Sequence, residues 1–195
     1  LAAGDGKIAN RAIVFGSDGT VRCRYNKIHL FDVDLPNGES WRESSVYVPG
    51  DRAQTADLEW CRLGVAICYD LRFPMLFRDL AQAGASVLTA PSAFTRQTGE
   101  AHWQVLQRAR AIENGAFMIS AAQGGLHADG RETYGHSIIV DPWGVVLAEA
   151  SGEAPDVIFA EIDPAKSSEA RERIPSHKNA REYAGPGETQ FALSA

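Results

Sequence analysis

The spacing of hydrophobic residues changes character between positions 65 and 81. Val65, Ala66 and Ile67 form a short apolar run of the kind that fills a buried strand. Apolar residues then recur at helical spacing, at Phe73, Leu76, Phe77, Leu80 and Ala81. Pro74 suits the first turn of such a helix, and Gly84 suits its end. The pattern therefore predicts a strand followed by a helix, with Cys68 on the turn between them.

Further apolar runs predict more buried strands along the chain. Residues 86–91 and 116–122 are typical of core strands, and the helical pattern of residues 100–114 ends at Gly115. One crossover helix separates the first two core strands, so this unit is predicted to be βαβ with parallel strands. We also expect a last strand at residues 157–160 and a last helix at 164–173.

Two hairpins are predicted beside these parallel strands. Residues 11–15 and 21–25 flank a turn-forming segment, and so do residues 136–140 and 145–148. Residues 32–51 show little periodicity and are predicted to form a long surface loop, which in compact domains is usually functional. A glycine-rich loop is expected after residue 122, and a polar tail after 174. The predicted fold class is α/β, with parallel strands at its centre.

Composition limits the classes of function. The chain has 195 residues, 45% of them hydrophobic, and a net charge of -6. The acidic balance argues against a nucleic-acid or membrane partner. Three cysteines are too few for a disulfide framework and match no zinc pattern, so a cytoplasmic location is expected. The sequence starts at Leu1 and enters strand-like residues almost at once, so we expect it to be the C-terminal part of a longer protein.

Three side chains and one amide supply the groups that acyl transfer requires. Cys68 is a candidate nucleophile, although a free cysteine is often only a small buried apolar residue. Amide groups at the start of the following helix are expected to favour its thiolate form. Lys27 could stabilise an oxyanion and Glu43 could move protons, although either could equally be a solvated surface charge. The backbone N–H of Tyr69 would be a second oxyanion donor.

Several motifs in this order resemble the nitrilase, or carbon–nitrogen hydrolase, superfamily. In the first half of the chain they are Tyr25-Asn26-Lys27-Ile28-His29-Leu30-Phe31-Asp32, Glu43-Ser44-Ser45, Pro49-Gly50-Asp51 and Cys68-Tyr69-Asp70-Leu71-Arg72-Phe73-Pro74. In the second half they are Pro91-Ser92-Ala93-Phe94, His102-Trp103, Arg108-Ala109-Arg110-Ala111-Ile112-Glu113, Tyr134-Gly135-His136-Ser137 and Asp141-Pro142-Trp143-Gly144. The resemblance is strongest to the branch that includes deaminated-glutathione amidase and ω-amidase.

The resemblance implies a four-layer αββα sandwich, a homodimer and no metal or organic cofactor. It assigns Cys68 as nucleophile, Lys27 as the oxyanion-stabilising lysine and Glu43 as a supporting glutamate. The implied substrate is a small linear primary amide that carries a carboxylate, cleaved through a cysteine thioester with release of ammonia. We expect this carbon–nitrogen hydrolase domain to occupy residues 1–174, with an extended tail over 175–195.

The chain departs from the family pattern in two places. The family's general-base glutamate lies upstream of the lysine strand, and no residue before Lys27 matches it. We therefore expect the first strand–helix units of the fold to be missing, and this chain alone to be inactive. Met75 stands where the family usually has glutamate, which leaves substrate orientation near Arg72 open.

Substrate recognition is predicted from arginine and aromatic positions. Arg72 and Arg96 are candidate carboxylate anchors, since arginine pairs with carboxylates in bidentate geometry, although each could form a structural ion pair instead. Phe94, His102 and Trp103 are candidates for the pocket wall, although a tryptophan near a helix start is as often core packing. The mechanism leaves no acid–base role for His136.

Other functions fit parts of the same pattern. An N-carbamoyl hydrolase or a nitrilase of the superfamily would use the same residues on another substrate. A non-catalytic interaction protein would explain the missing general base but not the retained Lys27, Glu43 and Cys68. A thiol redox protein is disfavoured because Cys68 has no partner in a Cys-x-x-Cys arrangement.

Overall fold

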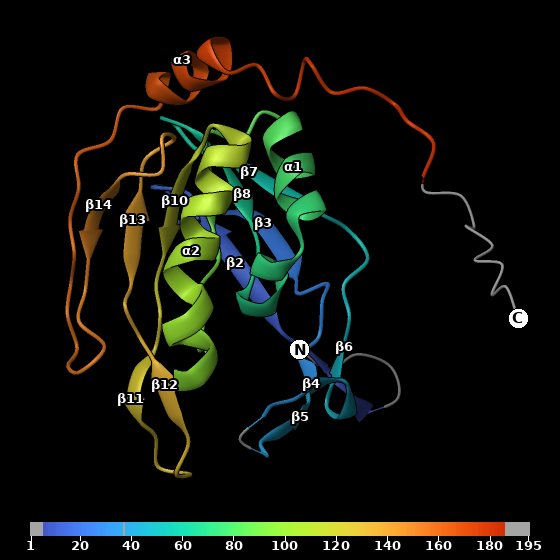
Figure 1. Ribbon diagram of the computed structural model, residues 1–195, viewed down its shortest axis with the longest axis vertical. Helices are drawn as coiled ribbons and strands as arrows, with labels where there is room; N and C mark the ends of the chain where they lie inside the picture. Colours follow the sequence, from blue (N-terminus) through green and yellow to red (C-terminus); the bar gives the residue numbers. More distant parts are fainter. Residues whose placement is uncertain (1–5, 37, 186–195) are drawn as a thin grey trace, which may run out of the picture.

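A six-stranded sheet forms the centre of the protein. The computed structural model describes residues 6–36 and 38–185 (Figure 1). The strand order is β14-β13-β10-β9-β8-β7. The strands are β7 (Gln54–Asp57), β8 (Arg62–Val65), β9 (Val87–Thr89), β10 (Phe117–Ser120), β13 (Ile138–Val140) and β14 (Val146–Glu149). β8, β9 and β10 pair in parallel, so the predicted parallel centre is confirmed. The predicted hairpin β13–β14 continues the sheet on one side, and β7 pairs antiparallel with β8 on the other.

Two helices cover one face of this sheet (Figure 1). α1 (Pro74–Gln82) has proline in its first turn, as predicted. α2 (Arg96–Asn114) ends at Gly115, whose left-handed φ of 52° suits glycine. It begins at Arg96 rather than Glu100 because the Thr95 side chain caps the Thr98 amide. No helix in the described part of the chain is long and apolar enough to cross a bilayer.

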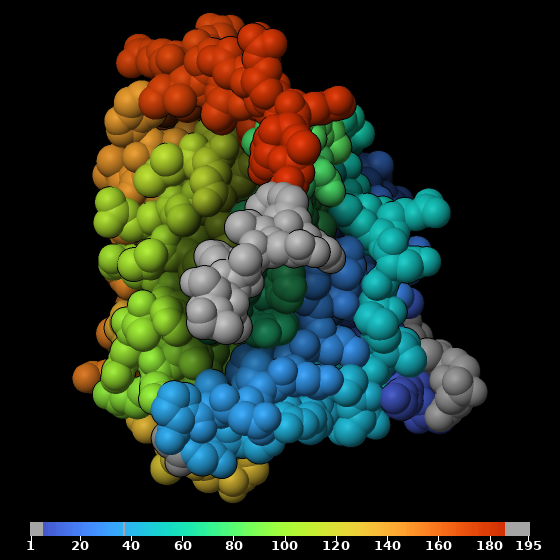
Figure 2. Space-filling view, turned by 45° about the vertical axis from the view of Figure 1, so that its right-hand side comes forward, coloured from blue at the N-terminus to red at the C-terminus, as the bar shows by residue number. Residues whose placement is uncertain are grey.

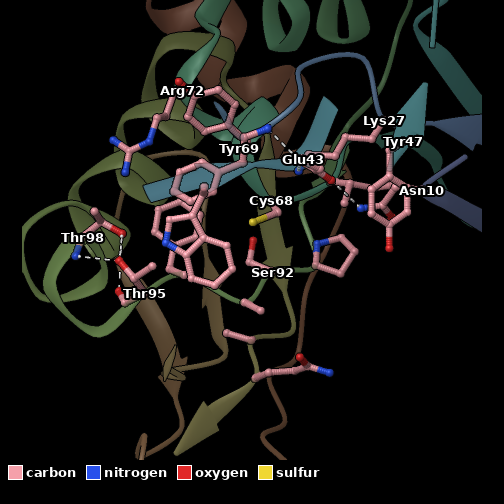
Figure 3. Close-up of a pocket in the computed structure, with 18 of the residues that line it drawn as sticks. Asn10, Lys27, Glu43, Tyr47, Cys68, Tyr69, Arg72, Ser92, Thr95 and Thr98 are labelled. Atoms are coloured by element: carbon pink, nitrogen blue, oxygen red, sulfur yellow. Dashed lines mark hydrogen bonds and ion pairs between the residues drawn. The ribbon is translucent and has the colours of Figure 1, made fainter. Parts of the chain in front are cut away.

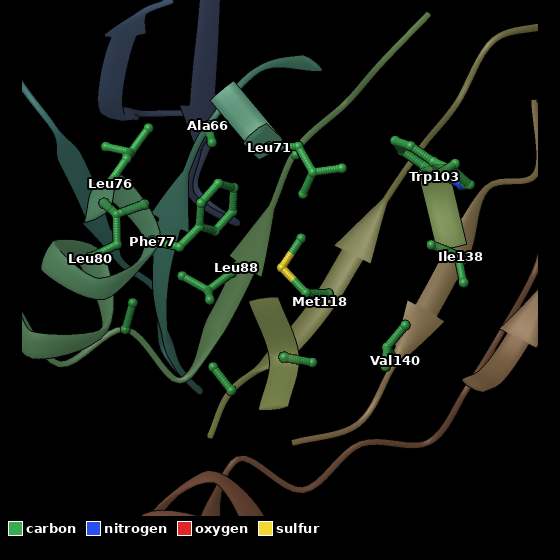
Figure 4. Packing of buried hydrophobic residues seen from close by; sticks show 14 of the residues in the cluster. Ala66, Leu71, Leu76, Phe77, Leu80, Leu88, Trp103, Met118, Ile138 and Val140 are labelled. Carbon is green, nitrogen blue, oxygen red and sulfur yellow. The ribbon is translucent and has the colours of Figure 1, made fainter. Parts of the chain in front are cut away.

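The main core lies between these helices and the sheet (Figure 4). Its members include Leu71, Phe77, Leu88, Trp103, Met118 and Ile138. Each of these side chains is almost completely shielded from solvent. Burying such side chains contributes about 1.5–3 kcal/mol each, so this cluster is the main anchor of the turn that carries Cys68.

A hairpin packs against the other face of the sheet. It consists of β2 (Arg11–Phe15) and β3 (Val21–Asn26), paired antiparallel as predicted. Its Tyr25 joins a second core cluster with Val65 and Ile67, whereas Ala66 faces the helices. Successive residues of a strand point to opposite faces, so the Val65–Ile67 run contributes to both cores. The described residues thus supply helices, sheet and hairpin, and the full four-layer sandwich stays a prediction.

Short strands occupy both of the predicted loops. Residues 32–51 contain β4 (Asp32–Asp34) paired with β5 (Ser40–Arg42), a 3-10 turn at Glu43–Ser45, and β6 (Tyr47–Val48), which pairs with β1 (Ile8–Ala9). The glycine-rich loop contains β11 (Gly124–Leu126) paired with β12 (Glu132–Tyr134). Both segments thus contain short paired strands where the sequence predicted only irregular loop.

The prediction was wrong at two strands. β7 was not predicted, because its Gln54–Asp57 sequence is mostly polar and only Ala56 is buried. The strand expected at residues 157–160 is not a strand in the structure, and Val157 and Phe159 are exposed. The last helix, α3 (Ala165–Arg173), is close to its predicted position. Residues 174–185 contain no helix or strand, and the rest of the expected tail lies outside the described residues.

Candidate active site

Cys68 begins a short turn that follows strand β8 after Ala66 and Ile67. It is the first residue of the 3-10 helix Cys68–Arg72, which leads into α1. Its φ of 48° lies in the left-handed region, which non-glycine residues rarely adopt. The Cys68 amide donates to the Pro91 carbonyl at 3.0 Å, so the strand pairing continues as far as the cysteine. This sharp strand-to-helix turn aims the side chain out of the sheet, as at the nucleophile of other hydrolases.

Lys27 lies just after β3 and is almost fully buried, with 3% of its surface exposed. Its amide donates to Asn10 at 2.9 Å, and its carbonyl accepts from the Gly50 amide at 2.8 Å. Gly50 must lack a side chain here, because a Cβ would approach the Asn26 carbonyl to 2.2 Å. The backbone on both sides therefore directs the Lys27 ammonium inward, and it is not the solvated strand lysine of the alternative interpretation.

Glu43 holds the Lys27 ammonium with a short ion pair. The Glu43 Oε2 lies 2.5 Å from Lys27 Nζ and accepts a hydrogen bond from the Phe31 amide at 2.7 Å. Its Oε1 accepts from Asn10 Nδ2 at 3.1 Å. With both oxygens bonded, Glu43 is positioned to orient the lysine rather than to move freely toward a substrate.

The three residues line one cavity of about 810 Å³. Cys68 lies at its centre, with Lys27 and Glu43 together on one side and Arg72 on another (Figure 3). Among the described residues that line the cavity, Glu43 is the only one with an acidic side chain. The space-filling view shows the surface hollowed beside α2 (Figure 2). A cavity of this volume is large enough for a small-molecule substrate.

The thiol of Cys68 is not favoured as thiolate in the resting protein. Burial raises its pKa above the ordinary value, and the Glu43 charge raises it further. Lys27, the Ala93 amide and the Ser92 hydroxyl lower the pKa, but burial dominates. The expectation that nearby amides favour the thiolate is therefore corrected, because burial raises the pKa by more than the neighbouring donors lower it.

This pKa direction predicts slow alkylation of Cys68 at neutral pH. Because the thiolate is the reactive form, the rate with iodoacetamide should rise with pH through a midpoint above that of a free cysteine, about 8.5. Glu43→Gln removes a charge that raises the pKa, so its midpoint should be lower. Mass spectrometry of the labelled Cys68 peptide measures both. A wild-type midpoint at or below that of free cysteine would contradict the assignment.

Arg72 and Phe94 form the wall of the cavity opposite the ion pair. The Arg72 guanidinium lies 5.3 Å from the Phe94 ring centroid and 6.0 Å from that of Tyr69. It contacts His102 Nδ1 at 3.3 Å and makes no ion pair with a carboxylate of residues 6–36 or 38–185. Burial lowers its pKa from the usual high value. Arg72 is thus a cation facing the cavity, while Met75 is exposed on α1.

Three of the predicted pocket residues do not line the cavity. Arg96 is exposed and forms ion pairs with Glu100 and Glu132, at 3.0 and 2.5 Å. His102 is exposed on α2 and reaches the site only through Arg72. Trp103 is fully buried in the main core. His102 and Trp103 are consecutive on α2, so their side chains point in different directions, one to solvent and one into the core.

Comparison with known proteins decides the family. The family described as carbon-nitrogen hydrolase matches residues 2–172. The chain belongs to the carbon-nitrogen hydrolase family. It is 45% identical over 178 residues to a deaminated glutathione amidase of Synechocystis, covering 90% of this chain and 65% of that relative. It is 42% identical over 176 residues to the human omega-amidase NIT2, covering 90% of this chain and 63% of the relative.

Solved structures of the carbon-nitrogen hydrolase family share the fold. The C. elegans NitFhit protein superimposes with a TM-score of 0.84 at 44% identity, over 90% of this chain and 43% of that one. Saccharomyces cerevisiae Nit3, of branch 10 of the nitrilase superfamily, gives 0.78 at 36% identity, over 89% and 60%. The resemblance to the nitrilase superfamily is therefore confirmed. The chain spans just under two thirds of the curated relatives, 65% and 63%.

Two residues of this carbon-nitrogen hydrolase site were missed in the sequence. Asn10 binds Glu43 and the Lys27 amide, but a single asparagine before a strand carries no distinguishing signal. Asp70 is fully buried beside the nucleophile turn, and its position two residues after Cys68 could have indicated a role. Residues 6–36 and 38–185 contain no group of three or more His, Cys, Asp or Glu that could hold a metal ion.

Proposed function

We propose that this chain carries the nucleophile and oxyanion site of an amidase acting on small linear amides that bear a carboxylate. The observation that carries the proposal is one cavity that joins Cys68 with the Lys27–Glu43 ion pair. Two matching relatives are named deaminated glutathione amidase and omega-amidase, so their named substrate classes are the first candidates. An ω-amide is a primary amide with a carboxylate elsewhere in the molecule, whereas deaminated glutathione is a secondary amide that also carries carboxylates.

The proposed reaction has two halves. In the first, the Cys68 sulfur bonds to the amide carbon, the C–N bond breaks, and the thiol proton leaves with nitrogen as ammonia. In the second, water attacks the thioester carbon, releasing the carboxylic acid and restoring the thiol. Lys27 and the Tyr69 amide would hold the negative oxygen that forms in each half.

Proton transfer is the part of the reaction that Glu43 is badly placed to perform. Both of its oxygens are already hydrogen-bonded, and it sits against Lys27. We assign the transfer to a glutamate outside residues 1–195, as the family pattern implies. Steps that need no proton donor should therefore proceed on this chain, whereas amide turnover should not.

An activated ester tests whether acylation of Cys68 proceeds on this chain without a proton donor. With p-nitrophenyl glutarate, the leaving phenolate needs no proton, so the chain should release about one equivalent in a burst and retain a glutaryl group on Cys68. Cys68→Ala should give no burst. Absence of acylation in the wild-type chain would overturn the proposed function. In a protein that also carries the proposed general-base glutamate, hydrolysis of ω-amides of keto acids, deaminated glutathione, N-carbamoyl compounds and nitriles, followed by their carboxylic acid, amine or ammonia products, then identifies the substrate.

Arg72 is the proposed anchor for the substrate carboxylate. Arg72→Gln should slow acylation by p-nitrophenyl glutarate on the order of 10–100-fold, because a hydrogen bond to a charged group contributes about 1.5–3 kcal/mol. Acylation by p-nitrophenyl pentanoate, which has a methyl group in place of the carboxylate, should change little. Arg96→Gln is the matched control, since Arg96 lies on the surface outside the cavity. An equal loss with both esters would exclude Arg72 as the anchor.

A homodimer is proposed from the family pattern, and a cytoplasmic location is proposed from the low cysteine content of the chain. The domain is proposed to end near residue 174, since the family match ends at residue 172 and α3 ends at Arg173.

A further inference from the structure

One buried carboxylate connects the two segments that carry Lys27 and Cys68. Asp70 is inaccessible to solvent and accepts four hydrogen bonds. Its Oδ2 accepts from the Tyr25 hydroxyl at 2.6 Å and from the Ile67 amide at 2.9 Å. Its Oδ1 accepts from the His29 amide at 3.0 Å and lies 2.7 Å from His29 Nδ1. The donors come from segments about 40 residues apart in the sequence.

The donors to Asp70 lie close to Lys27 and Cys68 in the sequence. Tyr25 lies two residues before Lys27, and His29 lies two residues after it. The Ile67 amide immediately precedes Cys68. Asp70 therefore bonds to a side chain before the lysine, to the backbone after it and to the backbone at the entry to the nucleophile turn.

The same turn is held from its other side by α2. The Arg110 Nε donates to the Leu71 carbonyl at 3.0 Å, and its guanidinium lies 5.7 Å from the Phe77 ring centroid. A cysteine with positive φ persists only where the surroundings hold it there. Asp70 and Arg110 bond to opposite sides of the turn, but only Asp70 also reaches the lysine segment.

We infer that Asp70 is a positioning residue that sets the placement of Lys27 relative to Cys68. The inference rests on the proposed function, because it concerns the effect of the lysine on the nucleophile. Asp70 itself does not line the cavity and is not assigned contact with substrate. Its action is through the two segments that it joins.

Asparagine at position 70 is a sharp test because it keeps the size and changes the hydrogen bonding. Three of the four partners are donors by their chemistry, and His29 Nδ1 is a donor when it carries the proton. A carboxylate accepts from all of them, whereas an amide places its NH₂ against one side. Asp70→Asn should therefore break hydrogen bonds that connect the Lys27 segment to the Cys68 turn, without leaving a cavity.

The experiment is a double-mutant cycle on the pH dependence of Cys68 alkylation. Lys27 lowers the pKa of Cys68, so a displaced lysine should raise the alkylation midpoint. Asp70→Asn should therefore slow iodoacetamide labelling on the order of tenfold at a fixed pH below the midpoint, which is about one pKa unit. In a Lys27→Met background, the same substitution should change the rate less than about twofold, because coupled residues are not additive.

Three controls separate positioning from loss of stability. Tyr25→Phe removes one of the four hydrogen bonds and should shift the midpoint in the same direction by less. Ser167→Ala removes a distant buried hydrogen bond, to the Gly115 carbonyl, and should lower the melting temperature without shifting the midpoint. Asp79→Asn makes the same chemical change at an exposed position of α1 and should have no effect.

Each other outcome contradicts the inference. An unchanged midpoint in Asp70→Asn would show that the lysine does not depend on Asp70. An equal shift with and without Lys27 would show an effect that bypasses the lysine. A lower midpoint with faster labelling would show only that the turn has opened to solvent. Acylation of the wild-type chain is measured separately, so failure of the proposed function is distinguishable from failure of this inference.

Discussion

Replacing Lys27 by methionine is expected to slow acylation of Cys68 by p-nitrophenyl glutarate by a factor on the order of 10²–10³. This is the usual cost of removing one donor that stabilises an oxyanion. The methionine side chain fills a similar volume, and Lys27 is almost fully buried, so the cavity should keep its shape. The measurement is the rate of the p-nitrophenolate burst, with the acyl group located by mass spectrometry.

The pH dependence separates the two effects of Lys27. The lysine lowers the pKa of Cys68 as well as binding the oxyanion, so part of the loss at neutral pH reflects fewer thiolates. Above the alkylation midpoint of each variant, only the oxyanion effect remains, and the rate should still be reduced at least about tenfold. Lys166→Met, an exposed lysine on α3, is the matched control. A normal rate in Lys27→Met would exclude the lysine from the reaction.

Replacing Trp103 by alanine is expected to lower the free energy of unfolding by about 3–5 kcal/mol, the usual cost of removing a large buried aromatic side chain. Trp103 is fully buried, and its ring lies 5.1 Å from that of Phe94 in an edge-to-face contact. Its indole N–H donates to the His136 carbonyl at 2.7 Å, so this acceptor would also lose its partner. Urea denaturation followed by circular dichroism measures the loss.

The matched control for Trp103 is Trp60→Ala. Trp60 is 52% exposed at the turn before β8, so its removal should cost less than about 1 kcal/mol. The remaining folded fraction of Trp103→Ala should still be acylated by p-nitrophenyl glutarate, since Trp103 does not line the cavity. A stable variant that has lost acylation would instead place Trp103 in the substrate site.

The sequence was sufficient to nominate Cys68, Lys27 and Glu43 as candidate site residues, which the structure brings to one cavity, but not to predict how they are held. The change between strand and helix periodicity placed Cys68 on a turn, and this prediction depends only on neighbouring residues. The burial of Lys27 depends on Asn10, Gly50 and Glu43. Each of these residues lies more than 15 positions from Lys27 in the sequence. The rise that burial causes in the pKa of Cys68 could likewise not be predicted from the residues next to it in the sequence.

Errors in the fold have a similar physical origin. The polar strand β7 is held by its pairing with β8 rather than by its own hydrophobicity. The apolar residues 157–160 have strand composition but do not form a strand in the structure. Trp103 and Arg96 share α2 with His102, yet one is buried in the core and two are exposed. Local composition identifies such residues, while long-range packing decides which surface each one faces.

The left-handed backbone conformation of Cys68 affects which substitutions evolution favours at this position. A non-glycine residue in that conformation costs of the order of 1–3 kcal/mol, which the rest of the fold must offset. Glycine would relieve that cost but would remove the sulfur. With Cys68 in its proposed role as nucleophile, selection for stability and selection for the reaction oppose each other at this position.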